Sequence, residues 1–125
     1  MENPNAIRCR LAHATGTGQY WRAFPENDKF LFTDGVKDMA EACDAFWLIS
    51  AVFSYQFDRK VRSEPFQVWI LQFNNKPQGD DALLICENGN NIELTRQEIS
   101  YTDFPLPEGI KLYLDGGVLM LPSEY

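Results

Sequence analysis

The chain has 125 residues, and its 18 acidic against 11 basic side chains give a formal net charge of −7. This balance argues against a dedicated nucleic-acid binder, whose affinity comes largely from Lys and Arg side chains that neutralise phosphates. No apolar run is long enough to span a membrane, and the three widely spaced cysteines lack a Cys-x-x-Cys pair, which indicates reduced thiols. We therefore expect a single cytoplasmic domain over residues 1–125.

A short first helix is predicted over residues 4–14. Pro4 suits its first turn, and apolar residues recur on one face at Ile7, Leu11 and Ala14. The Gly-Thr-Gly segment at 16–18 ends this helix. The lone histidine, His13, falls in the last turn, where a helix terminus favours the charged imidazole. A structural or surface role is commoner than catalysis for a histidine without an obvious partner.

Closely spaced aromatic residues follow at 19–24, among them Tyr20 and Trp21. They are either anchors of the core or the wall of a pocket, and the pattern leaves both interpretations open. After a turn at 25–28, residues 29–32 form a short extended run that leads into the next helix.

A long helix is predicted from Thr33 to residue 57. Thr33 is the expected N-cap, and Asp34 lies where the positive end of the helix dipole favours an acid. Beyond Asp44 the polar face disappears, so that residues 45–57 are apolar on all sides. Such a segment is expected to be buried all round, either as a central core helix or in an oligomer interface.

A basic cluster at residues 59–62 follows this helix. Cations there complement the negative end of the helix dipole and its free carbonyls, which explains the cluster well. A patch that binds phosphate or nucleic acid is the less favoured alternative.

From residue 66 onward the hydrophobic period changes to that of strands. Five strands are predicted, at 66–73, 82–87, 92–101, 110–114 and 118–121, with an Asn-Gly hairpin at 88–91, a proline-containing loop at 102–109 and a turn at 115–117. Helices followed by strands indicate an α+β fold. We expect a twisted antiparallel sheet of about four to five strands, with one long helix and a short N-terminal helix packed on one face.

The polar residues best suited to chemistry are scattered along the chain: His13, Tyr20, Asp34, Asp103 and Glu124. A thiol–imidazole pair of Cys43 with His13 is conceivable, but Cys43 falls on the apolar helix stripe, where an inert thiol is commoner. The sequence contains no recognisable metal template and no phosphate-binding glycine motif. We therefore assign no catalytic residue, no metal ligand and no cofactor.

Four segments resemble a family of small bacterial proteins known only as a domain of unknown function. They are residues 32–36 (Phe-Thr-Asp-Gly-Val), 46–49 (Phe-Trp-Leu-Ile), 101–105 (Tyr-Thr-Asp-Phe-Pro) and 117–125 (Gly-Val-Leu-Met-Leu-Pro-Ser-Glu-Tyr). The resemblance extends from about Gly16 to the end, and its last segment is the most specific. It implies an association with phage or other mobile elements, but no activity. The family pattern has an acid after the second segment, where this chain has Ser50.

Two functions from different classes follow as hypotheses. The first is a non-catalytic protein-interaction module that binds another protein or itself through aromatic residues (Tyr20, Trp21 and Trp47) or a sheet edge, with no nucleic-acid or membrane partner. The alternative is a small-molecule or enzymatic pocket near the start of the long helix, formed by Asp34, Tyr20 and Asp103.

Overall fold

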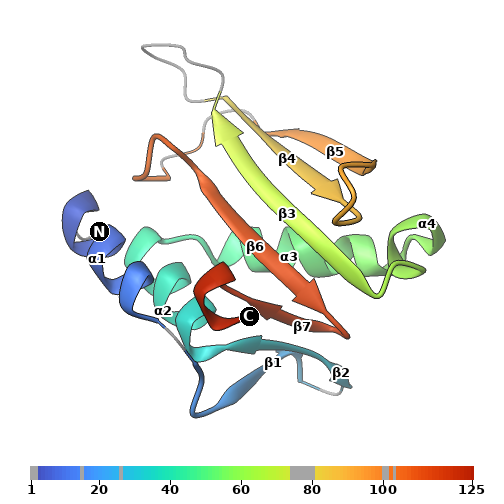
Figure 1. Ribbon diagram of the computed structural model, residues 1–125, viewed down its shortest axis with the longest axis horizontal. Coiled ribbons are helices and arrows are strands. Elements are labelled where there is room, and N and C mark those ends of the chain that lie inside the picture. The colour runs from blue at the N-terminus through green and yellow to red at the C-terminus, as the bar shows by residue number, and fades with distance from the viewer. Residues whose placement is uncertain (1–2, 15, 26, 74–80, 100–101, 103) are drawn as a thin grey trace.

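The computed structural model describes residues 3–14, 16–25, 27–73, 81–99, 102 and 104–125 (Figure 1). Its helices are α1 (Pro4–His13), α2 (Asp34–Cys43), α3 (Phe46–Ser54) and α4 (Arg59–Arg62), with short 3-10 turns η1 (Tyr55–Phe57) and η2 (Pro122–Glu124). Its strands are β1 (Tyr20–Phe24), β2 (Asn27–Thr33), β3 (Phe66–Phe73), β4 (Ala82–Glu87), β5 (Glu93–Ile99), β6 (Ile110–Asp115) and β7 (Val118–Met120). The fold is α+β, as the sequence predicts.

The strands form one seven-stranded open sheet in the order β1-β2-β7-β6-β3-β4-β5. All five strands predicted after the long helix are present. The predicted number of four to five is wrong, because β1 and β2 form an additional antiparallel hairpin. The expectation of a purely antiparallel sheet is wrong for one pair, since β2 runs parallel to β7 through Leu31 with Val118 and Phe32 with Leu119.

The predicted long helix is broken into α2 and α3, which corrects the sequence interpretation. Asp44 adopts a left-handed conformation at φ 51° and ψ 47° and caps α2 by donating its N–H to the Ala40 carbonyl. Ala45 donates to the same carbonyl at 2.8 Å, and α3 then begins at Phe46. Asp tolerates this conformation better than most residues, so the chain turns here although the apolar spacing continues.

The expectation that residues 45–57 are buried all round is also wrong. One side of α3 is buried through Leu48, Ile49, Val52 and Phe53. The other side is not, because Phe46 is 47% exposed and Phe57, in η1, is 67% exposed. This segment is therefore a core helix with one open edge.

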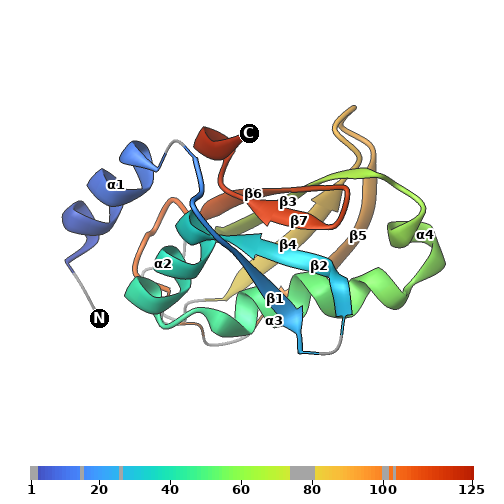
Figure 2. The same ribbon diagram turned by 90° about the horizontal axis from the view of Figure 1, so that it is seen from below.

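The helices α2 and α3 cover one face of the sheet, and α3 passes behind β3 and β6 in Figure 1. Figure 2 shows the same layering from below. The core lies between these layers and includes Val36, Met39, Leu48, Val52, Trp69, Leu71, Leu84, Leu112 and Leu119. The predicted N-terminal helix, α1, is confirmed, and it packs against α2 and η2. We call the opposite face of the sheet the outer face. None of the helices α2, α3 and α4 covers it.

Glycines at the β6–β7 turn let three strands come together. Gly116 and Gly117 have φ of 58° and 88°, which suits the hairpin turn predicted at 115–117. A Cβ on Gly117 would lie 2.2 Å from the Lys29 carbonyl oxygen. Glycine is therefore needed for β2 to approach this turn, where the Gly117 carbonyl accepts from Leu31 N–H at 2.9 Å.

Candidate functional site

The start of α2 is closed by residues from the end of the chain. The Thr33 hydroxyl accepts a hydrogen bond from Val36 N–H at 3.3 Å, as its predicted N-cap role requires, and donates to Glu124 Oε1 at 2.6 Å. Glu124 also accepts from the backbone N–H groups of Gly35 at 3.3 Å and Leu121 at 3.0 Å. One carboxylate thus accepts hydrogen bonds from donors at a helix N-terminus. Without it, these donors would be free to bind an anion.

Asp34 holds the segment that precedes β1. Its Oδ2 accepts from Gly18 N–H at 3.0 Å and Gln19 N–H at 3.1 Å, and its Oδ1 accepts from Trp21 Nε1–H at 2.8 Å. Its own N–H donates to Thr17 Oγ1 at 2.9 Å. The Trp21 hydrogen bond, aided by the backbone donors, lowers the pKa of Asp34 below its ordinary value. The hydrogen bonds that Thr33, Asp34 and Glu124 make at the start of α2 are together called the α2 clasp.

Gly35 leaves no space inside the clasp. A Cβ at this position would lie 2.6 Å from Glu124 Oε1 and 2.8 Å from Leu121 Cδ1. The clasp is therefore a packed structural joint, and its two carboxylates are occupied by donors of the chain itself.

The predicted binding residues lie in three different settings. Tyr20 is 58% exposed on β1, whereas Trp21 points to the other side of that strand, where its indole meets Asp34 and the Lys37 Nζ lies 4.6 Å from its ring centre. Trp47 is partly buried on α3 against the core. Asp103 lies outside the described residues. The structure thus brings Trp21 and Asp34 together, while Tyr20 pairs through its backbone with Thr33.

The imidazole lies beside a different cysteine from the one considered in the sequence. His13 Nδ1 is 2.7 Å from the Cys9 carbonyl oxygen and 3.7 Å from Cys9 Sγ. Because the carbonyl can only accept, Nδ1 carries a proton and is not a base for that thiol. Cys43 and Cys86 are buried, and burial raises the pKa of Cys86 to about 12, so that it remains a thiol.

Within the described part of the chain, no group of three or more His, Cys, Asp or Glu side chains could hold a metal ion. The helices seen in that part are all too short or too polar to cross a membrane.

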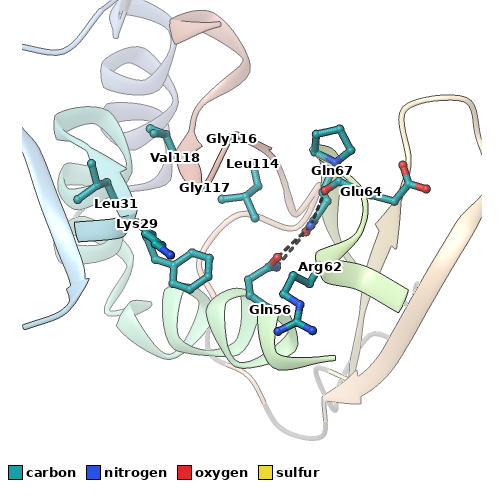
Figure 3. A pocket seen from close by; sticks show the side chains of 12 residues that line it. Lys29, Leu31, Gln56, Arg62, Glu64, Gln67, Leu114, Gly116, Gly117 and Val118 are labelled. Atoms are coloured by element: carbon teal, nitrogen blue, oxygen red, sulfur yellow. Dashed lines mark hydrogen bonds between the residues drawn. The ribbon is translucent and has the colours of Figure 1, made fainter. Parts of the chain in front are cut away.

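A pocket of about 510 Å³ opens where β2 and β3 diverge on either side of the β6–β7 turn (Figure 3). None of Tyr20, Trp21, Asp34 or Trp47 lines it. One wall comes from β2 and the turn, and the other comes from η1, α4 and the start of β3. Its lining residues are Lys29, Phe30, Leu31, Gln56, Arg62, Glu64, Pro65, Gln67, Leu114, Gly116, Gly117 and Val118.

Two buried glutamines form the polar part of the pocket. The amides of Gln56 and Gln67 exchange two hydrogen bonds of 2.9 Å, drawn as dashed lines in Figure 3. Gln67 also donates to the Val61 and Glu64 carbonyls, and its Oε1 accepts from Trp69 Nε1–H at 2.9 Å. These amides are fully engaged, and they tie α3, α4 and β3 together.

The outer face of the sheet carries apolar side chains across five strands, of which Val68 and Ile85 are buried and the others are partly exposed. Register pairs Ile85 with Ile70, Val68 with Tyr113, Tyr113 with Met120, and Val118 with Leu31. We call these seven residues the outer stripe. An aromatic triad lies beside it, in which Phe66, Tyr113 and Tyr125 have ring centres 5.3 to 5.4 Å apart and Tyr125 is 71% exposed.

Sequence reasoning noted Arg62 as part of the basic cluster at 59–62 but did not predict the pocket. Gln67 carries a usable signal, because a glutamine at a core-facing position of an apolar strand implies a buried hydrogen-bond network. Lys29 and Arg62 carry none, since their proximity depends on the tertiary fold.

The comparisons with known proteins give a family but no function. A family model described as a family of unknown function (DUF6876) matches residues 5–125. No curated protein and no solved structure matches the chain.

Proposed function

Because the chain belongs to this family of unknown function (DUF6876), we propose from its own surfaces that it is a non-catalytic module that binds another protein. The proposal includes a cytoplasmic location and a bacterial, mobile-element origin, which rest on the cysteine pattern and on the resemblance described above.

The outer stripe is the observation that carries this proposal. Single apolar residues on a surface are ordinary, but a connected set whose partly exposed members lie on four strands is typical of a protein-interaction site. Charged neighbours border it, since Lys111 is opposite Ile70 and Glu87 is opposite Val68. An apolar centre with a polar rim is the usual anatomy of such an interface.

The exposed aromatic triad supports the same surface. Tyr125 lies against Phe66 and Tyr113 and keeps most of its own surface open to solvent. Tyrosine buries a large area on binding at a low cost in side-chain entropy, which makes it frequent among the residues that dominate binding energy.

The β5 edge of the sheet is a weaker candidate than the outer face. Strand addition requires an accessible row of backbone groups, and β5 carries charged side chains at Glu93, Arg96 and Glu98. Charges on an edge strand are a common means of preventing such pairing.

The alternative of a small-molecule or enzymatic pocket at the start of α2 is less favoured. Asp34 already accepts three hydrogen bonds from its own chain, and Glu124 and Leu121 occupy the space beside Gly35. A carboxylate engaged in this way has little capacity left for a substrate.

The test is a tagged pull-down from a lysate of the source organism, with bound proteins identified by mass spectrometry. Ile70→Lys places a charge in the outer stripe, and Tyr125→Ala removes a ring from the aromatic triad beside it. Tyr20→Ala and Trp47→Ala remove rings from the aromatic surface expected from the sequence. All four variants are first checked for folding by circular dichroism.

Loss of a near-stoichiometric partner only in Ile70→Lys and Tyr125→Ala would assign binding to the outer face. Loss only in Tyr20→Ala and Trp47→Ala would assign it to the aromatic surface instead. A well-folded wild-type sample that retains no partner, and that is monomeric by light scattering, would contradict the proposed function.

A further inference from the structure

We propose that the pocket between β2 and the α4–β3 segment binds a small organic anion that has an apolar body. Its volume of about 510 Å³ lies within the range usual for small-molecule sites, roughly 300–1,000 Å³. The site is independent of the protein-binding function proposed above, although Leu31 and Val118 belong to both surfaces.

The walls are suited to the apolar part of such a ligand. Phe30, Pro65 and Leu114 contribute apolar side chains to the lining. Phe30 also belongs to an aromatic cluster, with ring centres 6.1 Å from Phe24 and 5.7 Å from the buried Phe53. This packing fixes one wall of the pocket before any ligand arrives, which reduces the entropy lost on binding.

Two cationic side chains, Lys29 and Arg62, are suited to bind the anionic group of the ligand. Lys29 lines the pocket from β2 and Arg62 lines it from α4, so the two cationic residues belong to opposite walls (Figure 3). Glu64 is the acidic lining residue, and its carboxylate points away from the cavity in Figure 3. In a chain with a net charge of −7, two cationic residues beside an apolar surface are a local departure from the overall charge balance.

Arg62 is the better placed of the two to bind a carboxylate directly. It ends α4 with an exposed side chain, and within the described residues its guanidinium takes part in no ion pair. A guanidinium can donate two parallel hydrogen bonds to one carboxylate, which adds orientation to the charge attraction.

The glutamine pair narrows the ligand class further. Gln56 and Gln67 use their amide groups on each other, on Trp69 and on backbone carbonyls. A sugar or other neutral polar ligand would need free donors and acceptors that these amides do not supply. A ligand whose apolar part contacts the amide pair edge-on, and whose charged group lies at the rim of the pocket, avoids that cost.

The experiment is an NMR titration of ¹⁵N-labelled protein with two probes that share one ring system. The first is 2-naphthoate, and the second is the neutral 2-naphthalenemethanol. We expect 2-naphthoate to shift the amide signals of Gly116, Gly117 and Val118 and to bind about tenfold more tightly than the alcohol, with an affinity that falls as salt is raised.

Arg62→Ala and Lys29→Ala should each weaken 2-naphthoate binding by about three- to tenfold and leave binding of the alcohol nearly unchanged. The matched control is Lys111→Ala, which removes the same charge from the outer face of β6 and should not alter affinity. Both pocket residues are exposed, so these variants are expected to fold normally.

Equal affinity for the two probes, an equal effect of Arg62→Ala and Lys111→Ala, or shifts confined to residues outside the pocket would each overturn the proposal. None of these results would affect the pull-down outcome that tests protein binding, because that assay uses outer-face variants.

Discussion

The α2 clasp and the pocket at the β6–β7 turn are built from similar parts but differ in what those parts contact. In the clasp, the carboxylates of Asp34 and Glu124 meet N–H and hydroxyl groups of the chain itself, and even a methyl group at Gly35 has no room. In the pocket, Lys29 and Arg62 line an open cavity. The first region has no room for a ligand, whereas the second has the space for one.

Two of the segments that carry the sequence resemblance lie at the clasp. The segments at 32–36 and 117–125, which carry the resemblance, supply Thr33, Asp34 and Gly35 on one side of the clasp and Glu124 on the other. In this chain these segments form a structural joint, so binding chemistry is better sought at residues outside them.

The largest expected effect on stability comes from the buried glutamine pair that forms the polar part, or floor, of the pocket. Gln67→Ala leaves the Trp69 indole N–H, the Gln56 amide and two backbone carbonyls without their partner, and should lower the free energy of unfolding by about 3 kcal/mol or more. Urea unfolding followed by fluorescence measures this. Gln72→Ala, at an exposed position of the same strand, should stay within about 0.5 kcal/mol of wild type. Similar values for the two variants would show that the floor contributes little to stability.

The second effect tests whether the clasp is closed. Gly35→Ala forces Glu124 and Leu121 apart and should cost about 1–3 kcal/mol in the same unfolding assay. Gly16→Ala is the control, since nothing lies within 4 Å of an added Cβ there. If Gly35→Ala were as stable as Gly16→Ala, the clasp would have spare room and could be considered as a binding site again.

A third, smaller effect measures the contact between the two ends of the clasp. Thr33→Val removes the N-cap acceptor of Val36 N–H and the donor to Glu124, and should cost about 1–2 kcal/mol. Combined with Glu124→Gln in a double-mutant cycle, it should show a coupling energy of about 1 kcal/mol. If the losses in unfolding free energy of the two single variants simply add in the double variant, the 2.6 Å contact contributes no measurable interaction energy.

The pH dependence of Asp34 gives the smallest signal. Hydrogen bonds from Trp21 and the backbone lower its pKa in the folded state below the ordinary 3.8, so its ionised form stabilises the fold above that value. This stability is lost as pH falls through the lower, folded-state pKa. Asp34→Asn should therefore be less stable than wild type at pH 7, with a difference that shrinks below about pH 4.

A conservative variant isolates the cause of this shift. Trp21→Phe removes the indole donor, which is the main contribution, and should raise the pKa of Asp34 in a ¹³C NMR titration of its carboxyl group. An unchanged titration would place the cause with the backbone donors of Gly18 and Gln19 instead.

The elements that follow local rules could be predicted from the sequence. The first helix, the Thr33 cap and all five strands after residue 65 lie close to their predicted positions, because capping and alternation are local properties. The break at Asp44 could not be found this way, since the apolar spacing runs through it. The parallel pairing of β2 with β7 depends on a distant strand, and no local pattern reports it.

The candidate sites follow the same division. Asp34 could be predicted as an acid at a helix start, but its three donors come from a segment whose position depends on the tertiary fold. The outer stripe reflects alternation within β3 and β6, yet only the strand order shows that their apolar residues are continuous. Arg62 could be seen only as part of a basic cluster after a helix.

The clasp also bears on the order in which the protein acquires its structure. Thr33 and Glu124 are 91 residues apart in sequence, so α2 emerges during synthesis long before its N-terminus can be completed. Bringing such distant residues together carries a large loop-closure cost and usually happens late in folding. The nascent chain therefore exposes the backbone donors and the apolar side of α2 until the segment that contains Glu124 has been synthesised, and chaperone binding would be most useful in this interval.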